Sequence, residues 1–441
     1  MLAAPVATGL AVLDMAQAGR FAEIRDLFAP QLRPMVTAEA LQAAWAAELG
    51  RKGPVSSVGT PVSEPAGAGA VVVKIPVTCE RGALTVMVSV HEGGWLTGIQ
   101  LAPPSAAEPT APWEPPAYAD PEKFDEQDVT VGTGALVVPG TLSLPHQSGP
   151  HQPRPLPAVV LLGGSGPGDR DETIGRNKLF KDLAWGLASR GVAVLRFDKV
   201  TYAHPGEVTK AHDFTVVGEY VPHAVAAVDL LRQHPAVDAG RVFLLGHSLG
   251  GTVAPRVAAV EPSVAGLVIL AGGTEPLHWA AVRQVRYLAS LDPETAAASQ
   301  PAIDAMSERA RLVDSPGLSP STPARELPFG VPAPYWLDLR GYKPVAVAAA
   351  LDRPILILQG GRDYQVTVAE DLAGWKAGLA GRADVTIRIY PPDNHFFFPG
   401  TGPSAPAESE PAQHVDPAVI ADIASWLTTT AGDAGRPEEP A

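Results

Sequence analysis

The chain has 441 residues, 46% of them hydrophobic, and a formal net charge of −14 at pH 7. This length predicts two folded domains, and the acidic balance without a local Lys/Arg tract argues against a nucleic-acid partner. The single cysteine, Cys79, excludes an internal disulfide, which is compatible with the reducing cytoplasm that we expect as the protein's location. No uninterrupted apolar segment approaches the ~18 residues that span a bilayer, so no membrane span is expected.

Residues 1–102 predict a small α+β domain. Apolar residues at helical spacing indicate one amphipathic first helix that continues through RFAEIRDLF. A signal peptide is the weaker interpretation, because no Lys or Arg precedes the apolar stretch and Asp14 interrupts it. Helical patterns reach Gly50, and the runs VVVKIPVTC, ALTVMVSV and WLTGIQL then predict the strands of a curved sheet. The domain holds no clustered acid, base and nucleophile, so a role in oligomerisation or in supporting a lid is expected.

A proline-rich stretch separates this domain from the rest of the chain and predicts a semi-rigid linker at residues 103–120. Residues 121–430 then alternate between strand and helix patterns. An opening hairpin, VTVGTGALVVPGTLSLP, precedes the buried-type strands PAVVLLGG, VAVLRFDKV, RVFLLGH, GLVILAGG, PILILQGG and VTIRIYPP. This alternation predicts an α/β fold with a mostly parallel sheet covered by helices on both faces. Residues 431–441 are expected to form a disordered tail.

One connection in the α/β domain is far longer than usual. About 80 residues between Gly273 and Arg353 contain no strand pattern, whereas apolar residues such as Ile303 and Met306 follow helical spacing. The segment at about residues 275–350 is therefore predicted to be an inserted helical cap.

The motif GHSLG stands where a strand pattern gives way to a helix pattern. Ser248 lies between Gly246 and Gly250, as in a nucleophile elbow, in which small flanking residues permit a sharp, strained turn. A serine hydroxyl needs a base to remove its proton and an acid to orient that base. Asp363 and His395 each follow a later strand, and the order Ser, Asp, His is the one expected for this type of triad.

Two neighbouring residues compete for these roles. Asp393 is the rival for the acid, but it shares the loop of His395 instead of following a strand of its own, so Asp363 is favoured. His247 adjoins the serine and is expected to pack or to hydrogen-bond in a loop, because adjacent residues on such a turn point apart.

The sequence also predicts donors for an oxyanion. One is the backbone N–H of Leu249, and the other is that of Ser165 or Gly166 in the loop GGSGPGDRDE. This loop lacks the ending and spacing of phosphate-binding motifs. Its charged residues, Asp169 to Glu172, are expected to form an ion-paired turn that holds the loop in shape. His146 and His151 lack carboxylate or cysteine partners, so no metal is expected.

Residues 121–430 resemble the α/β-hydrolase superfamily, and the motifs GGSGPGDRDET, RFDKV, GHSLGG, YWLDLRGY, QGGRD and NHFF are similar to those of a bacterial serine carboxylesterase branch. Members of that branch often carry an N-terminal domain of unknown function that is similar to residues 1–102, notably in CERGALTVMVSVHEGGWLTGIQLAPP. The resemblance implies the α/β-hydrolase fold, carboxylesterase activity and catalytic roles for Ser248, Asp363 and His395.

The expected function is hydrolysis of a small-molecule acyl ester through an acyl-enzyme, which requires no cofactor. A thioester, a lactone or a small amide as substrate, acyl transfer to an alcohol, and a non-catalytic binding protein are alternatives. Trp279, Tyr335 and Trp336 in the cap are interpreted either as the lining of an acyl pocket or as the cap's own core. Association into a homo-oligomer through residues 1–102 is left open.

Overall fold

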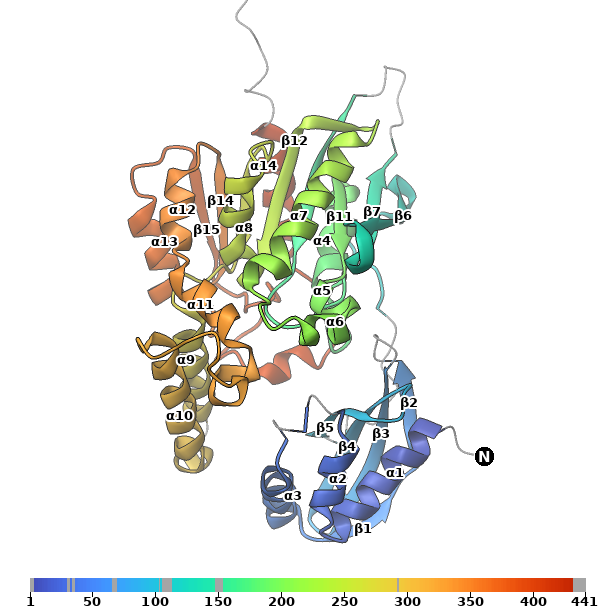
Figure 1. The fold of residues 1–441 in the computed structure, drawn as a ribbon. Coiled ribbons are helices and arrows are strands. Elements are labelled where there is room, and N and C mark those ends of the chain that lie inside the picture. Colours follow the sequence, from blue (N-terminus) through green and yellow to red (C-terminus); the bar gives the residue numbers. More distant parts are fainter. Residues whose placement is uncertain are drawn as a thin grey trace, which may run out of the picture. The chain divides into compact units, whose positions relative to one another are not determined.

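The structure is a computed structural model that describes residues 4–29, 32–33, 36–65, 70–102, 104, 113–146, 154–291 and 293–430. The chain divides into two units, residues 1–112 and 113–441 (Figure 1). Half of the predicted linker at residues 103–120 lies outside the described residues, and so does the whole predicted tail at residues 431–441.

The first unit is an antiparallel sheet with helices packed on one face. Its elements are α1 (Ala4–Gln17), α2 (Phe21–Leu27), α3 (Ala38–Lys52), β1 (Val55–Val58), β2 (Val62–Pro65), β3 (Ala70–Cys79), β4 (Gly82–His91) and β5 (Leu96–Ala102). The strands follow the order β1-β3-β4-β5, and β2 also pairs with β3. Alternate residues of β3 and β4, such as Val73 and Val88, point into one core with α1 and α2. The three predicted strands correspond to β3, β4 and β5.

The single first helix predicted from the sequence is wrong, because the structure contains two helices there. Gly19 adopts a left-handed backbone, with φ of 72°. Around it the N–H of Arg20 donates to Met15 O (2.9 Å) and that of Gly19 donates to Ala16 O (3.1 Å). This pair of bonds is a Schellman motif, which ends α1, and α2 then begins at Phe21. The apolar spacing continues across the break because both helices bury one face in the same core.

The second unit is an α/β domain. Its strands are β6 (Phe124–Val131), β7 (Val138–Pro145), β8 (Leu156–Leu162), β9 (Thr173–Ile174), β10 (Asn177–Lys178), β11 (Ala193–Phe197), β12 (Val237–His247), β13 (Leu267–Leu270), β14 (Ile355–Gly360) and β15 (Val385–Tyr390). Its helices are α4 (Leu179–Ala188), α5 (Val200–Ala203), α6 (Pro205–Lys210), α7 (Val216–Gln233), α8 (Leu249–Val260), α9 (Leu277–Ser290), α10 (Pro293–Asp314), α11 (Ala333–Gly341), α12 (Pro344–Ala350), α13 (Ala373–Gly378) and α14 (Pro417–Thr429).

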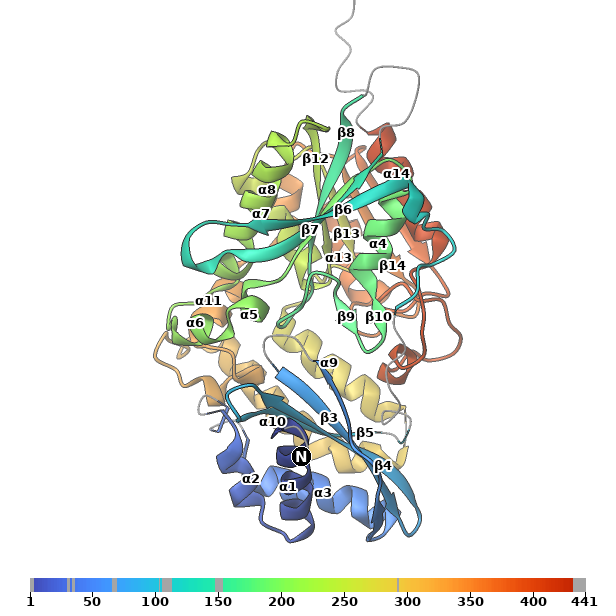
Figure 2. The ribbon, with the colours of Figure 1, turned by 90° about the vertical axis from the view of Figure 1, so that its right-hand side faces the viewer.

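The main sheet has eight strands in the order β15-β14-β13-β12-β8-β11-β7-β6. Pairing is parallel from β15 to β11, and the hairpin of β6 and β7 adds two antiparallel strands at one edge. Figure 2 shows α7 and α8 on one side of this sheet and α4 and α14 on the other. The predicted mostly parallel sheet with helices on both faces is confirmed.

The central strands are apolar throughout because both of their faces are buried. In β8, Val160 and Leu162 point towards the core shared with α7 and α8, whereas Val159 and Leu161 point towards the core shared with α4 and α14. Side chains alternate between the two faces of a strand, so a strand that is covered on both sides must be apolar at every position. This arrangement fixes the carboxyl ends of the strands along one edge.

The long connection between β13 and β14 contains helices α9 to α12, and none of its described residues is in a strand. Helices α9 and α10 pack side by side (Figure 1). A small core forms around Val313, Leu327 and Trp336. No helix among the described residues has the length and apolar character needed to cross a membrane.

Candidate active site

Four loops at the carboxyl edge of the sheet carry the residues predicted for the site. Ser165 and Gly166 follow β8, Ser248 follows β12, Asp363 follows β14, and His395 follows β15. Carboxyl-end loops of a parallel sheet converge on one crevice, which is the usual position of a ligand site in such folds.

Ser248 occupies a strained turn between β12 and α8. Its backbone has φ of 53° and ψ of −122°, a region that a residue with a side chain rarely adopts. The strain is held by hydrogen bonds on both sides: Ser248 N donates to Leu270 O (2.9 Å), and Ser248 O accepts from Thr252 N (3.0 Å). The serine is therefore fixed at the tip of the turn by the neighbouring strand and by the helix that follows.

The flanking glycines are required by close backbone approach. A Cβ at Gly246 would lie 2.3 Å from Gly250 O, and a Cβ at Gly250 would lie 2.1 Å from Leu162 O. Neither backbone oxygen can move away without breaking the turn or the end of β8. The sequence argument that glycines relieve crowding around this serine thus has a specific geometric basis.

Asp363 and His395 form a buried hydrogen-bonded pair. His395 Nδ1 lies 2.7 Å from Asp363 Oδ2, and the residues are only 3% and 6% exposed. Asp363 Oδ2 also accepts from the side chain of Gln359, while Oδ1 accepts from the backbone N–H groups of Gln365 (2.8 Å) and Val366 (2.9 Å). Three donors thus orient the carboxylate, and the carboxylate orients the imidazole.

Ser248 and His395 line the same small cavity of about 220 Å³, together with Glu172 and His247. Among the described residues, no hydrogen bond joins the Ser248 hydroxyl to His395. Such bonds are often long in a site without substrate and tighten when substrate binds.

The glycine-rich loop after β8 is held through the backbone of Gly164. Its N–H donates to Glu172 Oε1 (2.7 Å), and its carbonyl accepts from Lys199 Nζ (2.6 Å) and from the Tyr220 hydroxyl (2.8 Å). Lys199 is buried and pairs with Glu219 at 3.0 Å. Within the described part of the chain, the backbone N–H groups of Ser165 and Gly166 have no acceptor.

The charged residues that end this loop form the ion-paired turn that the sequence predicts. Asp169 accepts from the backbone and side chain of Thr173, and Arg170 pairs with Asp198 at 3.0 Å. Asp171 likewise pairs with Lys178 at 2.8 Å and with Arg196 at 2.9 Å. These pairs attach the loop to β11 and to the start of α4.

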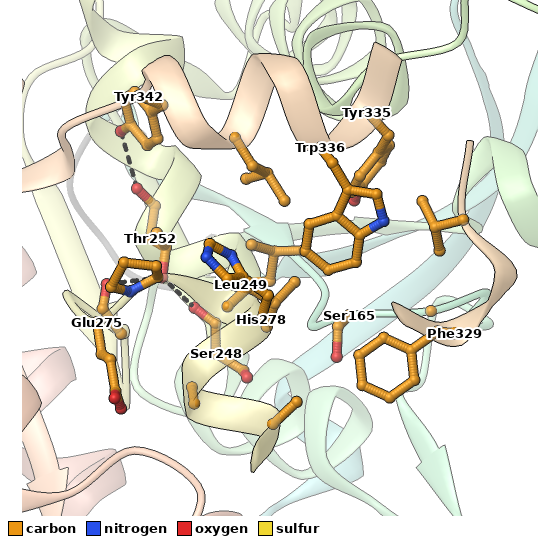
Figure 3. Close-up of a pocket in the computed structure, with 18 of the residues that line it drawn as sticks. Ser165, Ser248, Leu249, Thr252, Glu275, His278, Phe329, Tyr335, Trp336 and Tyr342 are labelled. Carbon is orange, nitrogen blue, oxygen red and sulfur yellow. Dashed lines mark hydrogen bonds between the residues drawn. The ribbon is translucent and has the colours of Figure 1, made fainter. Parts of the chain in front are cut away.

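A larger cavity of about 590 Å³ lies on the cap side of Ser248, and Leu249, Ser165 and Gly166 also line it. Figure 3 shows Tyr335 and Trp336 projecting from α11 on the side of the cavity opposite Ser248. The Tyr335 hydroxyl donates to Glu219 Oε2 (2.6 Å). Both aromatic residues are at least nine-tenths buried, so they belong to the cavity wall and to the packing of the cap at once.

Trp279 does not line either cavity. Its indole N–H donates to Asp314 (2.7 Å), and the adjacent His278 lines the larger cavity instead. His278 Nε2 also contacts Asp314, at 2.9 Å. Burial lowers the pKa of His278 despite the charge of Asp314, so this imidazole is a neutral hydrogen-bonding group in the wall. This role of His278 was not predicted, because helix periodicity alone does not decide which of two adjacent residues faces a cavity.

Asp393 is fully buried in the loop that carries His395, and within the described residues neither carboxylate oxygen has a hydrogen-bond partner. Burial and the negative charge of Asp416 raise its pKa to about 7, against the opposing effect of Arg362. Among the described residues no hydrogen bond joins it to His395.

This raised pKa predicts a pH-dependent effect of Asp393→Asn. A carboxyl group whose pKa is raised by folding stabilises the folded state below its ordinary pKa, and that contribution is lost as pH rises through about 7. Asn carries no charge, so the variant should melt at a higher temperature than the wild type at pH 8, with little difference at pH 4. Calorimetry at both pH values measures this.

Asp304→Asn is the matched control, because Asp304 is exposed on α10 and, among the described residues, its side chain bonds only to Gln300. Its melting temperature should differ from that of the wild type by the same small amount at both pH values. If the melting temperature of Asp393→Asn differs from that of the wild type by the same amount at pH 4 and pH 8, the raised pKa of Asp393 is contradicted.

Metal binding has no structural candidate among the described residues, where no group of three or more His, Cys, Asp or Glu side chains could hold an ion. His151 lies outside the described residues, and His146 contacts Asp125 and the backbone of Glu122.

Comparisons with known proteins show what this chain is similar to. A sequence model described as "Alpha/beta hydrolase family" matches residues 159–416. The chain is 38% identical to esterase EstD of Thermotoga maritima over 349 residues, which cover 79% of this chain and 77% of that protein. It is 32% identical to 2,6-dihydropseudooxynicotine hydrolase of Paenarthrobacter nicotinovorans over 30% of this chain and 32% of that protein. Among solved structures, Est1E from Butyrivibrio proteoclasticus matches with a TM-score of 0.43 and 17% identity, over 69% of this chain and 99% of that chain.

Proposed function

The chain belongs to the α/β-hydrolase family, and from this premise we propose that it is a carboxylesterase in which Ser248, His395 and Asp363 form the catalytic triad. The observation that carries the proposal is the buried hydrogen bond between His395 and Asp363 beside a strained serine that lines the same cavity as His395. The similarity to an esterase over most of the chain supports a carboxylic ester as the substrate.

In the proposed reaction, His395 Nε2 removes the proton of Ser248 while the serine oxygen attacks the ester carbonyl. The tetrahedral intermediate then expels the alcohol, which takes that proton from His395, and an acyl-serine remains. Water, activated in turn by His395, releases the carboxylic acid and restores the serine. The chemistry requires no metal or cofactor.

Asp363 keeps His395 in the tautomer that this reaction needs. Its Oδ2 accepts a hydrogen bond from Nδ1–H, so Nε2 is free to accept the serine proton. The backbone bonds from Gln365 and Val366 hold the carboxylate in place while the imidazole becomes positively charged.

Leu249 and Ser165 are the proposed oxyanion donors. Leu249 is the first residue of α8, so its N–H lacks an intrahelical acceptor. In a trans peptide the N–H points opposite to the preceding carbonyl. Because Lys199 and Tyr220 hold the carbonyl of Gly164, they also set the direction of the Ser165 N–H. Gly166 remains the alternative donor in this loop.

The two cavities suggest where the alcohol and the acyl group of the ester bind. His395 must reach the oxygen of the leaving alcohol, and it lines only the smaller cavity. The alcohol is therefore assigned to the smaller cavity and the acyl group to the larger one, which Leu249 and Trp336 line. An apolar pocket of this size favours acyl chains over charged groups.

Trp336→Ala should alter the acyl-length preference. Each buried methylene contributes about 0.8 kcal/mol, which is about fourfold in kcat/KM, so removing part of the wall should change the ratio between long and short p-nitrophenyl esters. The measurement is a chain-length series of kcat/KM together with the melting temperature.

Trp279→Ala is the matched control, because this tryptophan is outside both cavities. It should leave the length preference unchanged. A Trp336→Ala variant that loses activity equally on all chain lengths, in step with its stability, would mean that Trp336 serves only the packing of the cap.

A panel of p-nitrophenyl esters, acyl thioesters and lactones tests the ester assignment, and a fluorophosphonate probe tests the nucleophile. The proposal expects covalent labelling of Ser248 and the highest kcat/KM on an ester. Absence of labelling would favour a non-catalytic binding protein, and faster turnover of thioesters or lactones would reassign the substrate.

A further inference from the structure

His247 precedes Ser248 and makes hydrogen bonds through both ring nitrogens. Nδ1 lies 2.9 Å from Glu172 Oε1, and Nε2 lies 3.0 Å from the backbone carbonyl of His395. The imidazole is 1% exposed, so water cannot replace either bond.

The partners of His247 determine how many protons it carries. A backbone carbonyl only accepts hydrogen bonds, so Nε2 must be the donor to His395 O. An ionised Glu172 carboxylate also only accepts, and its Oε1 already accepts from Gly164 N. With Glu172 ionised, Nδ1 is therefore a donor as well, and His247 is a positively charged imidazolium.

This pair links three segments that the proposed reaction uses. Glu172 holds the backbone of Gly164 next to the proposed donor Ser165, His247 is part of the nucleophile turn, and the carbonyl of His395 belongs to the loop of the proposed base. Glu172 itself adopts a left-handed backbone, with φ of 48°. Strain of this kind persists where the surrounding structure enforces it, which is common at functional sites.

The charges around His247 favour the protonated state. Burial alone would lower the pKa of His247, but the Glu172 carboxylate, the His395 carbonyl and the charge of Asp363 outweigh burial and raise it. The ring centroid of His395 lies 4.7 Å from that of His247, and the uncharged ring of Phe396 lies 5.8 Å away, beside His395. The ion pair of Glu172 and His247 therefore contributes fully to the stability of the folded state below the ordinary pKa of histidine. This contribution is lost as pH rises through the raised pKa of His247.

We propose that Glu172 and protonated His247 are positioning residues for the esterase reaction, acting as one ion pair that aligns the oxyanion loop, Ser248 and His395. This inference rests on the proposed function. Loss of the shared proton leaves two acceptors, Nδ1 and Oε1, facing each other at 2.9 Å, which drives the loop away from the serine turn.

Two variants test the pair. Glu172→Gln keeps the size of the side chain and an acceptor for Gly164 N but removes the charge, and His247→Asn removes the imidazole. Each should lower kcat/KM by about 100-fold, the cost of a misplacement near 1 Å. In Glu172→Gln the alkaline decline of the pH profile should also begin at a lower pH than in the wild type, because the carboxylate no longer holds the proton on His247.

The double variant tests whether the two residues act as one unit. If they do, Glu172→Gln/His247→Asn should lose no more activity than the worse single variant. His223→Asn is the matched control, since His223 is also buried and bonds a backbone carbonyl, Leu136 O at 2.7 Å, but lines neither cavity. It should lower the melting temperature without shifting the pH profile.

The outcomes separate this proposal from the proposed function. If the wild type is not labelled by a fluorophosphonate, the serine hydrolase assignment fails. A second outcome is that the wild type is labelled, but Glu172→Gln has the same kcat/KM as the wild type and the alkaline decline of its pH profile begins at the same pH. That outcome refutes the positioning role of the pair. A fully additive double variant, or a loss that merely follows the melting temperature, would likewise overturn it.

Discussion

Replacing Ser248 with alanine should leave a folded protein whose ester hydrolysis is lower by about 10⁶-fold, the usual cost of removing a triad nucleophile. The variant keeps the backbone of the turn, since Gly246 and Gly250 relieve the crowding there and the bond from residue 248 to Leu270 is a backbone bond. Circular dichroism and melting temperature should therefore match those of the wild type, while turnover of a p-nitrophenyl ester and fluorophosphonate labelling disappear.

Ser165→Ala is the control at the same site. Ser165 lines both cavities, but the proposal uses its backbone N–H, so loss of its hydroxyl should keep activity within about tenfold of the wild type. If Ser248→Ala keeps more than a tenth of wild-type activity, Ser248 is not the nucleophile. If Ser165→Ala loses about as much activity as is expected for Ser248→Ala, Ser165 in the glycine-rich loop is the better candidate for the nucleophile.

Asp363→Asn should lower kcat by about 10⁴-fold. The asparagine amide can present its NH₂ group to His395 Nδ1, which favours the tautomer with the proton on Nε2. That tautomer cannot accept the proton of Ser248. The hydrogen bonds from Gln365 and Val366 can persist on the amide oxygen, so the effect on stability should be smaller than the effect on turnover.

Asp393→Asn is the comparison that decides between the two candidate acids. Asp393 lies two residues before His395, yet no hydrogen bond between them is present among the described residues, so its variant should retain most of the activity at pH 7. Measuring kcat of both variants on one ester suffices. If Asp393→Asn is the more damaged enzyme, the acid has been assigned to the wrong residue.

The main sheet was predictable because its signal is local. Runs such as PAVVLL are apolar at every position, and in the structure Val159 and Val160 indeed pack into opposite cores. The strand-to-helix junction at Ser248 and the strand ends before Asp363 and His395 follow from the same runs, so the order of the three residues could be read from the chain.

Other elements had weak or misleading local signals. Strands β1 and β2 are short, and their described residues are mostly exposed, so their composition resembles a loop. The two-residue strands β9 and β10 are too short for any periodicity. The break after α1 depends on a single glycine, Gly19, inside an apolar pattern that continues on both sides.

Contacts between segments that lie far apart in the sequence could not be predicted from local sequence patterns. Glu172 and His247 are separated by 75 positions, and Tyr335 and Glu219 by 116, so only the folded chain shows that each pair shares a hydrogen bond. The sequence predicted an ion-paired turn at Glu172 and either packing or a loop hydrogen bond for His247, but it could not identify the partner of either residue.

The connection between β13 and β14 leaves the sheet and returns to a directly neighbouring strand. These strands pair in parallel from Leu267 with Ile355 to Leu270 with Leu358, so the register of the sheet is independent of what the connection contains. Lengthening a connection costs little, about 0.6 kcal/mol for each doubling of a flexible loop. Exchange of residues 275–350 therefore need not disturb the pairing of β13 with β14, which makes this segment the natural unit to replace when a new substrate range is sought.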